Sequence, residues 1–140
     1  MAKSKSSDFD LLIKVVKDLE DFLPHLVLVG GWVPFLYVHF LWEKMTQEPL
    51  MTMDIDFGLR NMAFKGKETI AQQVIKKNYG EHHLEIGKEI PFVPIAKLEK
   101  GTSAEVEFIS DTNTPNDIRQ KLVGREIHVS ALPSVDVLLG

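Results

Sequence analysis

The sequence contains no cysteine. This absence excludes a disulfide framework and any metal site built on thiolates, and it suits a reducing compartment, so we expect a cytoplasmic protein. A long apolar run is also missing, because the stretch around residues 27–42 is interrupted by glycines, a proline and a histidine. Residues 11–22, which follow the polar N-terminus, carry lysines and acids, so they do not form a signal peptide. We therefore expect no membrane partner.

Positive charge is in the minority, with 16 Lys and Arg against 20 Asp and Glu, giving a net charge of −4. This balance argues against broad, sequence-independent binding of nucleic acid, which depends on neutralising phosphates. What is present is an ordinary globular composition, 44% hydrophobic over 140 residues. That length and composition predict a single domain with a real core.

Hydrophobic periodicity predicts alternating helices and strands. Helices are expected from near Asp8 to Pro24, and over residues 32–43, 67–77 and 118–122; strands are expected over 26–29, 53–57, 84–86, 92–98, 104–109 and 126–129. The two prolines Pro91 and Pro94 favour an edge position for their strand. The fold class expected is α/β (α+β), a mixed β-sheet flanked by helices.

The two ends of the chain are expected to differ. Residues 1–7 are expected to form a flexible N-terminus, and residues 8–140 to form the domain. The final segment, from Pro133, has the pattern of a helix start, yet the chain stops at Gly140 with apolar side chains unpartnered. We therefore expect either a chain that is truncated at its C-terminus or a partner that covers this end.

Asp54 and Asp56 form the pattern in the sequence that points most directly to a chemical function. Side chains two residues apart in a strand point to the same face, and two carboxylates there repel each other unless a cation compensates. Mg²⁺ prefers such hard oxygen ligands and commonly binds one or two carboxylates together with substrate phosphates. The alternative is a strand whose polar face lies in water, and an isolated Asp-x-Asp pattern does not decide between the two.

Gly30 and Gly31 follow a predicted buried strand and precede a predicted helix. Glycines let a backbone approach phosphate closely, and a helix N-terminus offers unpaired N–H groups to anions. A simple tight turn is the alternative. The pattern is neither a P-loop nor the dinucleotide fingerprint, because the further residues of those motifs are absent.

Glu107 is the third candidate. It shares a strand face with Glu105, opposite Val106 and Phe108, and a third acid near an aspartate pair can complete a metal site or act as a base. A solvated strand face is the alternative interpretation.

Taken together, the three motifs resemble the nucleotidyltransferase superfamily related to DNA polymerase β. The matching segments are Leu28-Val29-Gly30-Gly31-Trp32, Thr52-Met53-Asp54-Ile55-Asp56-Phe57 and Val106-Glu107-Phe108. The Gly-Gly-Trp and Thr-x-Asp-x-Asp forms are similar to small bacterial members, the AbiEii-type toxins of toxin–antitoxin systems and the aminoglycoside-type enzymes. The third acid is usually aspartate in this superfamily, and here it is glutamate.

This resemblance implies an enzyme that moves a nucleoside monophosphate from an NTP, such as ATP, to an acceptor hydroxyl and releases pyrophosphate. It implies that Gly30 and Gly31 hold the triphosphate, and that Asp54, Asp56 and Glu107 bind Mg²⁺, with Mn²⁺ as an alternative. Glu107 would also be a candidate base, and Glu105 is the alternative third acid. The acceptor, whether a small molecule, a protein or tRNA, stays open. The competing hypothesis is a catalytically degenerate domain that binds nucleotides or a protein partner.

Overall fold

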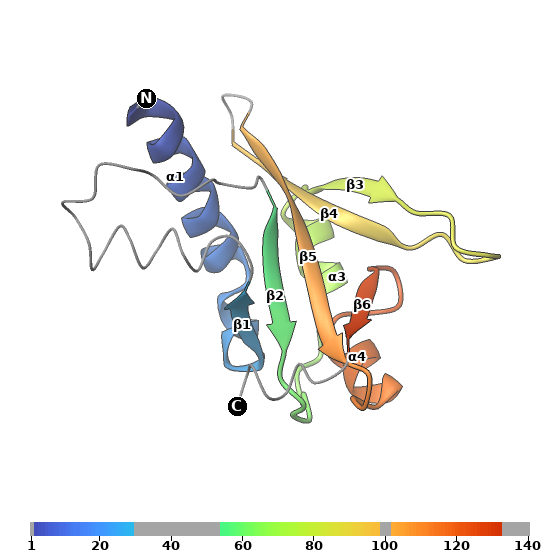
Figure 1. Ribbon diagram of the computed structural model, residues 1–140. Coiled ribbons are helices and arrows are strands. Elements are labelled where there is room, and N and C mark those ends of the chain that lie inside the picture. The colour runs from blue at the N-terminus through green and yellow to red at the C-terminus, as the bar shows by residue number, and fades with distance from the viewer. Residues whose placement is uncertain (1, 30–53, 99–101, 133–140) are drawn as a thin grey trace.

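The computed structural model of the protein describes residues 2–29, 54–98 and 102–132 (Figure 1). In these ranges the elements follow in the order α1 (Ala2–Asp18), the 3₁₀-helix η1 (Glu20–His25), β1 (Leu26–Val29), β2 (Ile55–Leu59), α3 (Ile70–Lys76), β3 (Gly80–His83), β4 (Phe92–Lys97), β5 (Ser103–Asp111), α4 (Asn116–Leu122) and β6 (Val129–Leu132). The expected mixed α/β class is confirmed. The helix expected over residues 32–43 lies outside the described residues.

The strands of the described ranges form one mixed sheet of six strands in the order β1-β2-β5-β4-β3, with β6 also paired to β5. Strands β2 and β6 run parallel to β5, whereas the β1–β2, β4–β5 and β3–β4 pairs are antiparallel. Residues 103–105 of β5 pair with β4, and residues 108–111 pair with β6. Because β2 occupies the other edge of β5, this strand is the centre of the sheet.

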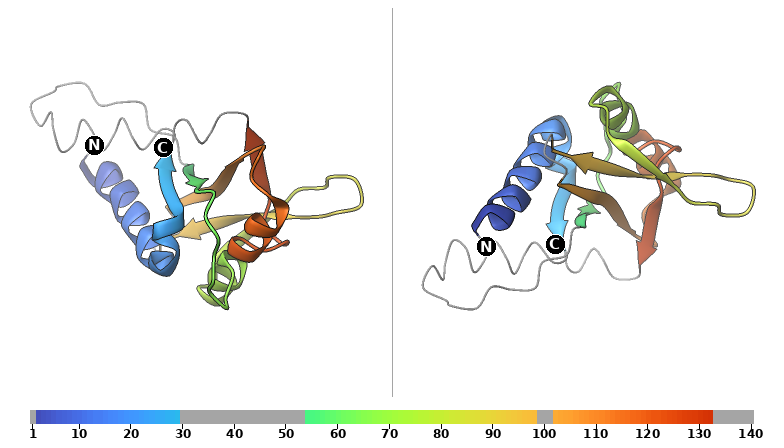
Figure 2. Two further views of the ribbon diagram at one scale, coloured as in Figure 1. Left: turned by 90° about the horizontal axis from the view of Figure 1, so that it is seen from below. Right: turned by 90° about the horizontal axis from the view of Figure 1, so that it is seen from above.

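One face of the sheet forms the hydrophobic core. Alternation along the two central strands buries Ile55 and Phe57 from β2 and Val106 and Phe108 from β5. The buried apolar side chains of the helices belong to the same cluster: Leu11, Leu12, Val15, Ile70, Ala71, Val74 and Leu122. Figure 2 shows α3 and α4 on one side of the strands. Among the described residues, no helix combines the length and the apolar character needed to cross a bilayer.

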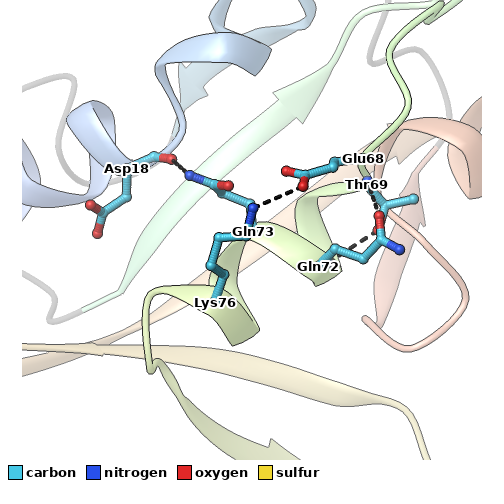
Figure 3. A network of polar contacts seen from close by, with 6 residues as sticks. All are labelled: Asp18, Glu68, Thr69, Gln72, Gln73 and Lys76. Atoms are coloured by element: carbon cyan, nitrogen blue, oxygen red, sulfur yellow. Dashed lines mark hydrogen bonds and ion pairs between the residues drawn. The ribbon is translucent and has the colours of Figure 1, made fainter.

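Helices α1 and α3 are joined by polar contacts on the core side of the sheet (Figure 3). The Gln73 side-chain amide donates a hydrogen bond of 2.9 Å to the backbone carbonyl of Asp18. The Tyr79 hydroxyl, just beyond α3, donates to the Asp18 carboxylate at 2.8 Å. Thr69 begins α3 with a capping box, in which its hydroxyl accepts from the Gln72 backbone and the Gln72 side chain accepts from the Thr69 backbone. These contacts fix how α3 starts and how it lies against α1.

The N-terminal helix differs from the prediction at both ends. It begins at Ala2, so residues 2–7 belong to the helix and do not precede it, and it ends at Asp18, well before Pro24. Pro24 instead lies inside η1, where Phe22 still packs into the core. A 3₁₀ turn keeps an apolar side chain directed inward while the chain changes course toward β1, and apolar spacing alone does not distinguish this from a continuous helix.

The β3–β4 region also differs from the prediction. The strand before β4 is Gly80–His83, whereas residues 84–86 lie in the connection, where Ile86 forms an isolated bridge with Glu89. The prediction that the prolines place β4 at an edge is wrong, because β4 lies between β5 and β3. Pro94 is tolerated because the β4–β5 ladder covers only Ile95–Lys97, so Pro94 lies where that ladder ends. The last strand is similarly shifted, to Val129–Leu132.

Candidate functional site

Asp54 and Asp56 lie at the start of β2, on the face opposite the core. Asp56 belongs to the strand and Asp54 directly precedes it, and both side chains are half-buried. Their neighbour Ile55 is 0% exposed and Phe57 is 2% exposed, because these two point into the core. The alternation that was expected for this segment is therefore confirmed, and the two aspartates share one face.

Glu107 lies next to Asp56 across the sheet. In the parallel β2–β5 pair, Asp56 is the register partner of Glu107, and Ile55 is the partner of Val106. Neighbouring strands lie about 4.8 Å apart, so side chains of register partners stand side by side. The sequence hypothesis required the acids to come from adjacent strands, and the sheet order brings these strands together.

Glu105 extends this group, so that Asp54, Asp56, Glu105 and Glu107 form what we call the carboxylate cluster. Burial raises the pKa of Glu107 to about 7, and a hydrogen bond to Asp56 and the charges of Asp56, Asp54 and Glu105 contribute further. Burial and the charges of Glu105 and Asp56 also raise the pKa of Asp54. Burial and the charges of the neighbouring acids therefore oppose the ionisation of Glu107 and Asp54.

One atom of the cluster has no partner among the described residues. The Oδ1 atom of Asp56 is buried and accepts no hydrogen bond there. A buried carboxylate oxygen without a donor is costly, and either a proton or a cation relieves the cost. Asp56 is thus the member of the cluster that has most to gain from a positively charged ligand.

Glu105 and Glu107 have different surroundings. The Glu105 carboxylate lies 2.8 Å from Nδ1 of His82, which reaches it from β3 across β4. Glu107 instead faces Asp56 directly. Of the two glutamates considered as third acid, Glu107 is therefore the register partner of Asp56, whereas the charge of Glu105 acts on Asp54.

The contact made by His82 was not anticipated. The sequence places His82 and His83 in adjacent positions, which point to opposite faces of a strand, so the pattern predicts a poor joint metal site and favours a surface loop. In the structure, His82 contacts Glu105, and His83 contacts Glu81 at 2.9 Å. The contact between His82 of β3 and Glu105 of β5 depends on the order of the strands in the sheet, and no local sequence pattern predicts it.

Gly30 and Gly31, the expected triphosphate site, lie outside the described residues. The structure does place the residue before them, because Val29 at the end of β1 is the register partner of Asp56.

No protein-family model, no curated protein and no solved structure matches this chain. The function of the site therefore has to be argued from its own chemistry.

The donor set suits a hard divalent cation. In the described ranges, the His, Asp and Glu side chains do not form a ready group of three or more around a common ion. The available donors nevertheless match Mg²⁺ in kind, since all are carboxylate oxygens, and the Asp56 Oδ1 atom has no other partner in these ranges. A cation would also lower the mutual repulsion that raises the pKa of Asp54 and Glu107. The residues present therefore suit such an ion in the chemistry of their donor atoms.

Proposed function

We propose that the protein is a Mg²⁺-dependent nucleotidyltransferase that uses an NTP, such as ATP, and an acceptor hydroxyl. The observation that carries the proposal is the register pairing of Asp56 with Glu107, which puts acids from β2 and β5 on one sheet face with Asp54. Burial and repulsion raise the pKa of Glu107 and of Asp54, and carboxyl groups with raised pKa values are typical of sites that act on charged ligands.

In this proposal Asp54, Asp56 and Glu107 hold the cation, with Mn²⁺ as the alternative to Mg²⁺. The bound ion supplies charge neutralisation on the phosphate oxygens. Gly30 and Gly31, which follow the residue paired with Asp56, are proposed to bind the triphosphate through their backbone.

The reaction forms one bond and breaks one. The acceptor oxygen bonds to the α-phosphorus of the NTP, and the bond from that phosphorus to the bridging oxygen of the pyrophosphate group breaks. Pyrophosphate leaves with the electron pair of the broken bond. Glu107 accepts the proton of the acceptor hydroxyl, a role that its carboxylate can take because it lies beside Asp56 on the face where the cation would be held. The acceptor can be a small molecule, a protein or tRNA.

The test separates binding from turnover. Wild type, Asp56→Asn and the control Glu85→Gln, an exposed glutamate of the β3–β4 connection, are incubated with Mg²⁺ and each NTP. We expect Mg²⁺-dependent thermal stabilisation by at least one NTP in wild type and control, and its loss in Asp56→Asn. Transfer of α-labelled nucleotide with release of pyrophosphate then tests catalysis.

Two outcomes count against the proposal. Equal stabilisation of wild type and Asp56→Asn would remove the role of the carboxylate cluster in nucleotide binding. Stabilisation that depends on Asp56, without transfer to any acceptor class, would instead support a degenerate domain that binds nucleotides and does not turn them over.

A further inference from the structure

A second candidate site lies apart from the carboxylate cluster. A cleft of about 490 Å³ opens between the β3–β4 connection, helix α4 and the segment from Gly124 to Val129. None of the four clustered carboxylates lines it. Its volume lies in the range of pockets that bind small organic molecules.

The cleft is positively charged within an acidic protein. Arg119 of α4 and Arg125, just after that helix, line it, and Glu89 is its one acidic residue. Among the described residues, neither arginine forms an ion pair. Two arginines that line one cavity without forming ion pairs there favour the binding of an anion.

Arg119 is held in place yet incompletely satisfied. Its Nη2 group donates a hydrogen bond to the side-chain oxygen of Asn116, one turn earlier in α4. Its Nε group is buried and has no partner in the described structure. A buried N–H donor without an acceptor is unfavourable. The side-chain amides of Asn116 and Gln120 add further donors to the same wall.

The other wall of the cleft is apolar. Ile127 is 4% exposed, and Val129 and Pro91 are half-buried beside it, whereas Ile90 is 63% exposed at the rim. A ligand with only charged groups would leave this wall in contact with water. The combination indicates a ligand that carries both an anionic group and an apolar part.

We propose that this cleft binds a small phosphate monoester, with the phosphate on Arg119 and Arg125 and the organic part against Ile127 and Val129. A phosphate group offers three terminal oxygens to the donors of the two guanidinium groups, whereas a carboxylate offers two. The inference is independent of the proposed transferase activity, because it uses none of the residues of the carboxylate cluster.

The test uses phenyl phosphate as the probe, at constant ionic strength because screening alone alters charged contacts. The measurement is the NMR signal of the Arg119 Nε–H group together with the backbone amide signals of α4. We expect a saturable shift with phenyl phosphate and a weaker one with benzoate. Arg119→Gln and Arg125→Gln should each weaken binding about tenfold or more, in line with the loss of a charge-assisted hydrogen bond. Lys121→Gln, which removes an exposed charge of α4 outside the cleft, should leave the affinity unchanged.

Three results would overturn the inference. A shift that never saturates would mean that the arginines respond only to bulk charge. Equal weakening by Lys121→Gln would mean that the net charge of α4, and not the cleft, attracts the probe. Benzoate binding as tightly as phenyl phosphate would remove the preference for phosphate. If Arg119→Gln fails to fold, Arg125→Gln still decides the outcome, because Arg125 is exposed and its removal leaves no cavity.

Discussion

Replacing Glu107 by glutamine should stabilise the protein at neutral and alkaline pH. Burial and the neighbouring acids raise the pKa of Glu107 from its ordinary value of 4.5 to about 7. The protonated form is therefore favoured by folding, and this contribution is complete below pH 4.5 and is lost as the pH rises through about 7. Glutamine keeps the shape of the protonated acid and has no proton to lose. The variant therefore stays neutral at high pH and avoids the cost of ionising a carboxyl group at this position.

The size of the effect follows from the raised pKa and the exposure of the side chain. Each unit of pKa corresponds to about 1.4 kcal/mol, which limits the penalty to about 3 kcal/mol. Glu107 is only half-buried, and screening by solvent reduces the value to about 1 kcal/mol. For a chain of this length, that is a rise in Tm of about 4 °C at pH 8.

Urea unfolding of both proteins at pH 4, 6 and 8, with EDTA present, measures the difference. The free energies of unfolding should be nearly equal at pH 4 and diverge at pH 8, with the variant more stable. Added Mg²⁺ should stabilise wild type more than Glu107→Gln. Glu85→Gln serves as the control for a lost surface charge. A difference between wild type and variant that is the same at every pH would refute the electrostatic argument.

Three further predictions concern the site, a helix start and the core. Asp56→Asn should lower nucleotide transfer at least about 100-fold, measured as pyrophosphate release, while Glu85→Gln retains activity. Thr69→Ala should lower the free energy of unfolding by about 1 kcal/mol in urea, since it removes the capping box of α3. Phe108→Ala should cost about 4 kcal/mol, because Phe108 is 1% exposed and its ring stacks 6.0 Å from that of Phe57. A Phe108→Ala protein as stable as Thr69→Ala would contradict the central place assigned to β5.

The sequence predicted the parts of the structure that local patterns determine. Alternation of apolar and polar residues identified β5 and the shared face of Asp54 and Asp56, and the burial along β5 follows this alternation. The carboxylate cluster was predicted because its members lie in two strongly alternating strands. The metal, the nucleotide and the transfer reaction stay predictions.

The features that the sequence did not predict depend on long-range pairing. From the sequence, Pro94 is expected in an edge strand. It is tolerated in the interior strand β4 because the β4–β5 ladder begins only at Ile95. His82 of β3 contacts Glu105 of β5 across β4, the single strand that lies between them in the sheet. The cleft at Arg119 likewise combines the β3–β4 connection with α4, two segments whose proximity no local motif encodes.

The parallel pairing of β2 with β5 determines how late in synthesis the carboxylate cluster can form. Asp56 and Glu107 are register partners, yet α3, β3 and β4 all lie between them along the chain. During synthesis the aspartates leave the ribosome before Glu107 does. Roughly 50 further residues must be added, at about 5–20 residues per second, before Glu107 can pair with Asp56. The anionic cluster, and any cation it holds, is therefore assembled only after most of the domain has emerged.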